Sequence, residues 1–144
     1  MVEKNTINLL GKIEEQKKND LIIFTTYTFD PIFFDAYLLK NLKQNNPGVD
    51  IIVLMDYKLF YGLEDSTAVT GKDYVVVPIK TRKVFHSKIF MFISESKKQI
   101  FLGSHNLTLS GLAQNLELCF SSDDNILFEN CINYINSLLK KDHN

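Results

Sequence analysis

The sequence lacks tryptophan altogether and contains few cysteines. Its 144 residues include two cysteines with no Cys-x-x-Cys spacing, beside eleven phenylalanines and six tyrosines. This aromatic composition indicates a core rich in phenylalanine. Cys119 and Cys131 fall at positions expected to face the core, so two reduced, buried thiols are favoured over a disulfide between them.

A long apolar run is also missing. The N-terminus, M-V-E-K-N-T-I-N-L-L, does not contain the apolar stretch of roughly 7–15 residues that a signal peptide needs. No apolar run reaches the length of a transmembrane helix. The expected compartment is therefore the cytoplasm, and no membrane partner is expected.

Neither sign of charge is in clear excess. Sixteen Lys and Arg side chains stand against seventeen Asp and Glu side chains, which gives a formal net charge of -1. Any attraction to phosphate groups must therefore be local. Hydrophobic residues make up 45% of the chain and charged residues 23%, as in ordinary soluble globular proteins. The simplest organisation is a single domain over residues 1–144.

The apolar pattern predicts a βαβ unit followed by further strands and a last helix. Strands are expected at 21–26, 50–56, 74–79, 84–94, 99–104 and 116–121, and helices at 5–18, at 31–44 and after Asp123 or Asp124. Residues 57–72 are expected to be irregular, 94–98 to form the turn of an antiparallel hairpin, and 107–113 a turn or short helix. The predicted fold class is α/β, with a mixed, mostly parallel sheet and helices on both faces.

Local signals support several of these elements. Asp30 before Pro31 is a strong helix start, because aspartate caps a helix and proline suits its first turn. Pro78 indicates that the strand 74–79 lies at an edge of the sheet. The last helix should turn one side to the core, formed by Leu127, Cys131, Tyr134 or Ile135, and Leu138.

Five polar residues interrupt the apolar runs between residues 84 and 120. His86 and Lys88 are two apart, Ser104 and Asn106 are two apart, and Glu117 is the one charged residue of its run. Side chains two apart share one face of a strand, so these five can gather on one surface. A turn explains G-S-H-N equally well, and a lone histidine is more often structural. A carboxylate among apolar residues, however, needs a partner.

The pattern H-S-K, then G-S-H-N, then N-L-E-L resembles the His-x-Lys, Gly-Ser-x-Asn and Glu signature of the phospholipase D superfamily. The run from Gly103 to Glu117 is similar to its nuclease branch, which includes the metal-independent restriction endonucleases of the BfiI type. T-Y-T-F-D-P, after the first strand, is also typical of that branch. The fuller motif has an aspartate where this chain has Ile93, a loss shared with the restriction-enzyme-like members. The resemblance implies a phospholipase D-like fold.

The resemblance also implies a phosphodiester hydrolase that needs no metal and no cofactor. His86 would attack phosphorus and form a phosphohistidine, and Glu117 would hold the other ring nitrogen. Lys88 and Asn106 would bind the phosphate oxygens, and Ser104 would donate a further hydrogen bond or orient Asn106.

A second histidine is required as general acid, and the chain offers no good candidate. His105 should point away from Ser104 and Asn106 by strand alternation, and His143 lies near the C-terminus. We therefore expect a homodimer in which two copies of His86 and Lys88 surround one phosphate.

The catalytic residues do not distinguish DNA, RNA and phospholipid substrates. DNA is favoured, with RNA possible, because Lys80, Arg82 and Lys83 precede the catalytic strand and Tyr27 follows the first strand, where they could contact a nucleic acid; a solvated basic turn is the alternative for the three cations. A restriction or antiphage nuclease is the favoured role, either as a non-specific nuclease or with specificity supplied by another domain or subunit. The competing hypotheses are a catalytically silent binding module and a phospholipid phosphodiesterase.

Overall fold

The computed structural model describes residues 2–5, 9–61, 72–82, 87–108, 111–112 and 119–142. Within these residues, seven strands form one sheet. The strands are β1 (Val2–Asn5), β2 (Leu21–Thr26), β3 (Asp50–Asp56), β4 (Val75–Ile79), β5 (Ile89–Ile93), β6 (Lys98–Gly103) and β7 (Cys119–Ser122). The helical elements are α1 (Leu9–Glu14), α2 (Pro31–Phe33), the π-helical turn η1 (Phe34–Leu38), α3 (Leu39–Asn45), α4 (Tyr57–Tyr61) and α5 (Asn125–Asp142).

The sheet is mixed, as predicted, but its neighbouring strands are mostly antiparallel rather than mostly parallel. Its order is β1-β7-β6-β5-β2-β3-β4. β2 pairs in parallel with β3, and β3 with β4, whereas β5 is antiparallel to β2 and β6, and β7 is antiparallel to β6 and β1. The parallel prediction came from the single βαβ unit. In the second half of the chain, antiparallel pairing makes β5 and β7 run opposite to the strands on either side of them.

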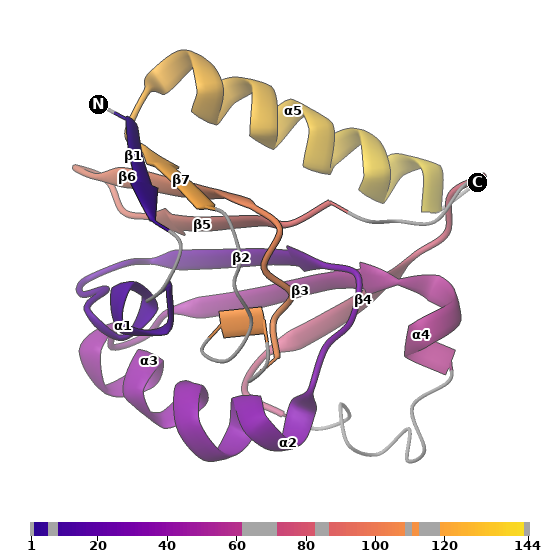
Figure 1. Ribbon diagram of the computed structural model, residues 1–144, viewed down its shortest axis with the longest axis horizontal. Coiled ribbons are helices and arrows are strands. Elements are labelled where there is room, and N and C mark those ends of the chain that lie inside the picture. The colour runs from indigo at the N-terminus through magenta and orange to yellow at the C-terminus, as the bar shows by residue number, and fades with distance from the viewer. Residues whose placement is uncertain are drawn as a thin grey trace.

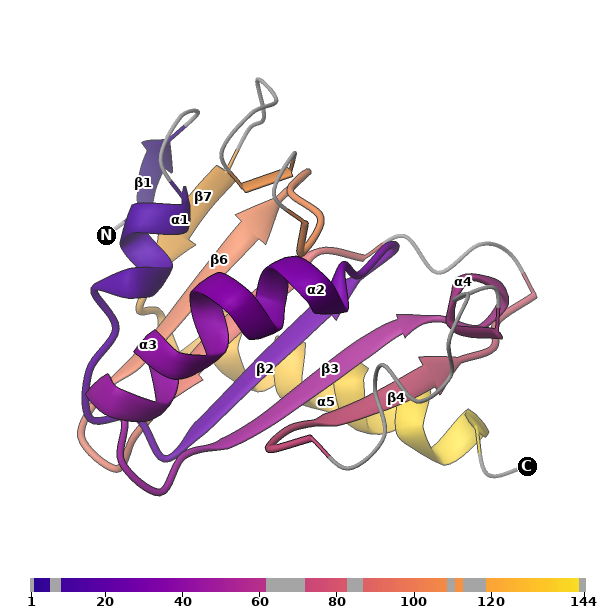
Figure 2. The ribbon, with the colours of Figure 1, turned by 90° about the horizontal axis from the view of Figure 1, so that it is seen from below.

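Helices cover both faces of the sheet, as predicted (Figures 1 and 2). The helices α1 to α3 lie on one face, over a core dominated by phenylalanine. The ring of Phe24 meets those of Phe34, Phe90 and Phe92 edge-on, at centroid distances of 5.0 to 6.0 Å. The composition had indicated this kind of core, and edge-to-face contacts stabilise it beyond simple area burial.

The long helix α5 covers the other face. Its buried residues Cys131, Ile135 and Leu138 pack against β-strand residues that include Ile23 and Met91. The predicted apolar side of this helix is therefore confirmed, with Ile135 rather than the more exposed Tyr134 turned inward. Cys131 is a free thiol, and burial raises its pKa.

The helix starts and the hairpin turn that local sequence signals predicted are found in the structure. The side chain of Asp30 accepts a hydrogen bond from the Phe33 backbone N–H at 3.1 Å, so it caps α2 as predicted. Asp124, not Asp123, caps α5 through the Leu127 N–H at 2.8 Å. The hairpin of β5 and β6 and the edge position of β4 are also confirmed.

Three boundaries differ from the prediction. The first helix spans only Leu9–Glu14 instead of 5–18, and residues 2–5, for which no strand was predicted, form β1 against β7. A short helix, α4, occupies the start of the segment expected to be irregular. In the described residues β5 begins only at Ile89, after Lys88, and the parts of the predicted strands at 84–86 and 116–118 lie outside the described residues.

Candidate active site

The chain segments that carry the candidate site meet where several strands of the sheet end, here named the site edge. β2, β3, β4 and β6 end at this edge, and β5 begins there (Figure 2). Loops that leave the ends of adjacent strands lie side by side, which makes such an edge a common place for a site. Lys88, Ser104, Asn106 and Tyr27 all belong to these loops.

A buried threonine fixes the segment around Lys88. The Thr25 hydroxyl donates to the Ser87 carbonyl at 3.1 Å and accepts from the Ile89 N–H at 2.8 Å. Ser87 then faces α5, where its hydroxyl lies 2.5 Å from that of Tyr134. Lys88, the next residue, lines a small hollow with Phe90 and His105, among others. The two hydrogen bonds of Thr25 thus fix the backbone on both sides of Lys88.

Asn106 is anchored through one end of its carboxamide. Its Oδ1 lies 3.2 Å from the Tyr27 N–H and 3.4 Å from the Thr28 N–H, and the Thr26 hydroxyl lies 3.3 Å away. The Thr26 hydroxyl also accepts from the Leu107 N–H at 3.0 Å, which joins the two loops again. With Oδ1 held by donors, the amide nitrogen keeps two N–H groups for an oxygen-bearing ligand, and it donates to no atom in the described part of the chain.

The loop after β6 is held by a hydrogen bond between two of its own residues, His105 and Gly111. His105 is 3% exposed, and its Nδ1 lies 2.5 Å from the Gly111 carbonyl. A carbonyl only accepts, so Nδ1 carries a proton. A Cβ at Gly111 would come within 2.4 Å of the Asn106 carbonyl oxygen, so glycine allows this close approach. His105 is therefore a buried support, in agreement with its predicted direction away from exposed Ser104.

The structure brings together only part of the predicted site. Lys88 is linked to the loop after β6, because the Gly103 N–H donates to its carbonyl at 3.3 Å, and Asn106 is linked to Tyr27. The predicted residues His86, Glu117 and Lys83 lie outside the described residues, as does His143.

Lys80 and Arg82 lie farther along the same edge, beyond β2 and β3. Both are exposed at the end of β4, beside a cavity of about 390 Å³ whose walls include Tyr57 and Lys58 of α4. The Lys80 ammonium lies 5.1 Å from the centroid of the Tyr57 ring. Sequence reasoning found the two cations but missed α4 and with it the aromatic wall.

The sequence also did not reveal the supporting residues Thr25 and Thr26. Both are completely buried, although polar. Two adjacent threonines at the end of an apolar run were the available signal, because buried hydroxyls need hydrogen-bond partners. Their partners come from residues roughly 60 to 80 positions later in the chain, which no local pattern contains.

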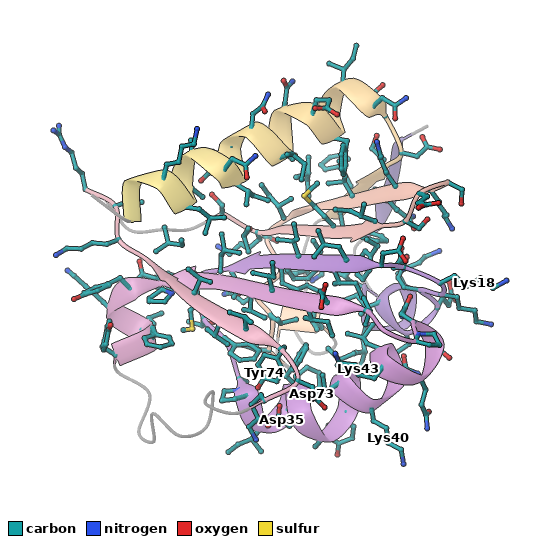
Figure 3. All side chains as sticks on the ribbon, turned by 180° about the vertical axis from the view of Figure 1, so that it is seen from behind. Lys18, Asp35, Lys40, Lys43, Asp73 and Tyr74 are labelled. Carbon is teal, nitrogen blue, oxygen red and sulfur yellow. The ribbon has the colours of Figure 1, made fainter. Side chains whose placement is uncertain are left out.

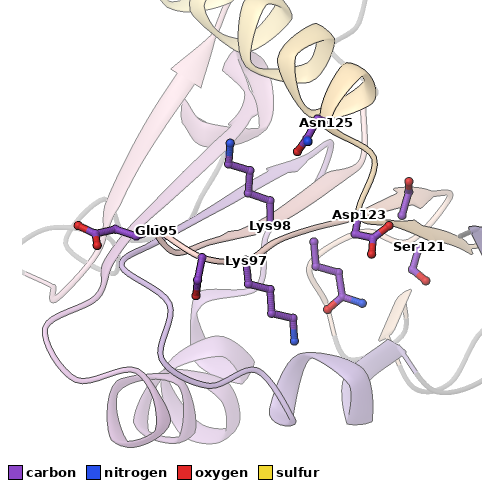
Figure 4. A pocket seen from close by; sticks show the side chains of 9 residues that line it. Glu95, Lys97, Lys98, Ser121, Asp123 and Asn125 are labelled. Atoms are coloured by element: carbon purple, nitrogen blue, oxygen red, sulfur yellow. The ribbon is translucent and has the colours of Figure 1, made fainter.

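A second cavity, of about 480 Å³, lies at the opposite edge of the sheet (Figure 4). Its lining includes Glu95 and Lys97 of the β5–β6 turn and Asp123 and Asn125 at the start of α5. The length of β5 and β6 separates it from Lys88 and Asn106. It is therefore not part of the candidate active site.

The described residues lack two further classes of feature. They contain no group of three or more His, Cys, Asp or Glu side chains placed to hold a metal ion. They also contain no helix with the length and apolar character needed to cross a membrane.

Comparison with known families identifies this arrangement. Residues 9–139 match the family described as "Cardiolipin synthase, PLD-like domain". The chain belongs to this PLD-like family. The Lys88, Ser104 and Asn106 positions of the resemblance therefore lie in a PLD-like domain that spans almost the whole chain.

Solved structures show the same PLD-like fold. NucT from Helicobacter pylori has a TM-score of 0.72 at 15% identity, with 97% of each chain covered. Nuc from Salmonella typhimurium, described as a phospholipase D family member, has a TM-score of 0.71 at 18% identity, with 97% of this chain and 94% of Nuc covered. Yeast tyrosyl-DNA phosphodiesterase has a TM-score of 0.57 at 15% identity, with 85% of this chain and 32% of the yeast protein covered. A search of curated proteins gave no match.

Proposed function

We propose that this PLD-like protein is a metal-independent phosphodiester hydrolase, and that its substrate is DNA, which it cuts internally. The observation that carries the proposal is the geometry at Lys88 and Asn106. An ammonium group and an oriented carboxamide N–H pair come from adjacent loops at one edge of the sheet. Donors fixed before the reaction stabilise the charge that develops on phosphate oxygens, and they need no reorganisation to do so.

His86 is the nucleophile in this proposal. A neutral ring nitrogen of His86 attacks phosphorus, a P–N bond forms, and the bond from phosphorus to the leaving oxygen breaks. The leaving oxygen takes its proton from a second histidine. Water then attacks phosphorus, gives a proton to that second histidine, and releases His86 as the P–N bond breaks. Glu117 holds the other ring nitrogen and stabilises the imidazolium.

The second histidine comes from another copy of the chain. In a symmetric pair, His86 of one copy is the nucleophile, and His86 of the partner copy is the general acid and then the base. Lys88 and Asn106 of both copies surround the same phosphate, and Ser104 donates a further hydrogen bond or orients Asn106. His105 does not fill the second role, because it is buried and donates to Gly111.

DNA is favoured by three considerations. The run from Gly103 to Glu117 is similar to the nuclease branch of the superfamily. Tyrosyl-DNA phosphodiesterase, one of the structural neighbours, carries a DNA substrate in its name. Lys80 and Arg82 extend the basic character along the site edge. Restriction or antiphage cleavage is the proposed role, with sequence preference supplied by a further domain or subunit; RNA is the second nucleic-acid candidate.

A phospholipid diester is the second candidate substrate, since the family description names a cardiolipin synthase. Both reactions would use the same nucleophile and oxygen-binding groups. Phosphatidylglycerol vesicles, assayed beside DNA, distinguish the two substrates.

The decisive experiment incubates the purified protein with supercoiled plasmid DNA in excess EDTA. We expect nicking or linearisation that persists in EDTA and is lost in His86→Ala, since no other group replaces the nucleophile. Cutting that survives His86→Ala contradicts the mechanism. Absence of cutting, with headgroup release from the vesicles, assigns the lipid substrate instead. If the DNA, the vesicles and an RNA substrate all remain intact, the domain is a binding module.

A further inference from the structure

A second group of side chains at the site edge is suited to nucleic acid but plays no part in the chemistry. It consists of Tyr57, Lys58 and Tyr61 of α4 with Lys80 and Arg82 after β4, and is here named the α4 platform. Both segments begin where adjacent parallel strands end (Figures 1 and 2).

The aromatic part of the α4 platform is open to solvent. The Tyr61 side chain is 66% exposed. Its ring lies 4.8 Å from that of Tyr57 and 4.9 Å from that of Phe60, so neighbouring rings support it from within its own helix. An exposed ring held in place by other rings offers a flat apolar face at little entropic cost on binding.

The cations are placed around these rings. Lys80 lies over the Tyr57 ring, and Lys58, Lys80 and Arg82 are all exposed beside the cavity of about 390 Å³. Among the described residues that line the cavity, the one carboxylate is that of Asp56, which is 6% exposed and accepts from the Lys58 N–H at 3.0 Å. Its carboxylate caps α4 and does not point outward, where it would repel a phosphate. The described side chains around the cavity therefore carry a net positive charge, on a chain whose net charge is -1.

We propose that the α4 platform binds the unpaired bases and flanking phosphates of single-stranded DNA. This inference rests on the nuclease function proposed above and names the form of its substrate. A ring stacks on a base only where the face of that base is uncovered, which duplex stacking prevents. Cations alone would bind either form of DNA, so the exposed tyrosine is the group that selects single strands.

The distance from the α4 platform to Lys88 fits one bound strand of DNA. β5, β2, β3 and β4 are consecutive in the sheet, and neighbouring strands lie about 4.8 Å apart. The platform is thus roughly 10–15 Å along the edge from Lys88. A strand whose diester lies at Lys88 and Asn106 passes Tyr27 and reaches Tyr61 within a few nucleotides.

The test measures binding without cleavage. Full-length His86→Ala protein is titrated into a fluorescein-labelled oligonucleotide and into a duplex of the same sequence, and fluorescence anisotropy is recorded. We expect tighter binding of the single strand. Adding Tyr61→Ala should weaken single-strand binding roughly tenfold, from the loss of one stacked base, and change duplex binding less than about twofold. Tyr61→Phe should retain the single-strand affinity.

Tyr37→Ala is the matched control, since Tyr37 is likewise an exposed tyrosine, at 69%, but belongs to η1 and not to the platform. It should bind both forms like the parent. Equal weakening of both DNA forms by Tyr61→Ala, or no weakening of either, overturns the inference. Plasmid cutting by the wild-type protein is scored separately, so the nuclease function can hold while the α4 platform fails, and the platform can bind while cutting fails.

Discussion

At the scale of single residues, the carboxamide of Asn106 is the most closely constrained group of the candidate site. Its oxygen faces the backbone N–H groups of Tyr27 and Thr28, so the orientation of the amide follows from the fold and not from a bound ligand. Only one of the two orientations of the carboxamide satisfies these donors, because an NH₂ group in place of the oxygen would face the two backbone N–H groups, donor against donor. The N–H pair is consequently ready for an anion before any substrate arrives.

The substitution Asn106→Asp tests this directly. One carboxylate oxygen can still accept from Tyr27 and Thr28, whereas the other replaces the N–H donors with a negative charge next to the phosphate. We expect the rate of plasmid cutting to fall by about 10²–10³-fold, the usual effect of removing one such donor, while the fold is retained. Initial rates and a thermal melt by circular dichroism measure the two effects.

Asn125→Asp is the matched control for Asn106→Asp. Asn125 is exposed at the opposite edge of the sheet, and the change adds the same charge (Figure 4). Its cutting rate should equal that of the wild type. A rate for Asn106→Asp within about threefold of the wild type would show that the amide donors do not bind the phosphate, since a lost donor costs far more.

At the scale of elements, a polar contact holds the segment before β4 against η1. The Tyr74 hydroxyl donates to Asp35 Oδ1 at 2.8 Å, and the Lys72 ammonium lies 2.8 Å from Asp35 Oδ2. Tyr74 and Asp35 lie beside each other between β4 and the helices (Figure 3). Burial, then the hydrogen bond to Asp35 and its charge, raise the pKa of Tyr74.

The raised pKa of Tyr74 predicts a loss of stability in alkali. An unfolded tyrosine ionises at a pKa of about 10, so above this pH the unfolded chain releases a proton that the folded chain retains. The free energy of unfolding therefore falls as the pH rises through about 10 toward the higher folded pKa. Tyr74→Phe should destabilise the protein by about 1–3 kcal/mol at pH 8, because the hydrogen bond to a carboxylate is lost. The gap should narrow at about pH 11, where the wild type loses its tyrosine contribution.

Urea unfolding of both proteins at the two pH values measures the change in the gap. Tyr37→Phe, at an exposed tyrosine, corrects for the general effect of removing a hydroxyl. A gap between the wild type and Tyr74→Phe that is the same at both pH values would contradict a raised folded pKa.

The elements that sequence reasoning recovered share one property: their signals are local. The Asp30–Pro31 helix start and the 94–98 turn depend on neighbouring residues, and both are confirmed. β1 depends on pairing with β7 at the far end of the chain, so no local pattern predicted a strand at residues 2–5. The candidate site shows the same contrast between local and long-range signals. Its motif residues could be named from their spacing, whereas the Thr25 clamp on Lys88 exists only once β2 and β5 are paired.

At the scale of the whole molecule, the proposed mechanism needs two chains for one reaction. The described part of the chain contains one histidine, His105, and it is buried and bonded to Gly111. If nucleophile and general acid are the His86 residues of two copies, a dimer with one altered copy lacks one of the two functions. A dimer with two separate, self-sufficient sites would instead keep half of its activity. Mixed dimers therefore distinguish a shared site from two independent ones.

Wild-type protein and His86→Ala are unfolded together in equal amounts, refolded as a mixture, and assayed on plasmid DNA. Random pairing places two intact copies in about a quarter of the dimers, so a shared site predicts about a quarter of the activity of the same total amount of wild-type protein. Samples refolded separately and then combined briefly before the assay should show about half, because no mixed dimers have formed. If the co-refolded sample also shows about half, each chain works alone. A second histidine would then have to be found within one copy, and neither His105 in its present contacts nor a symmetric pair of His86 residues could supply it.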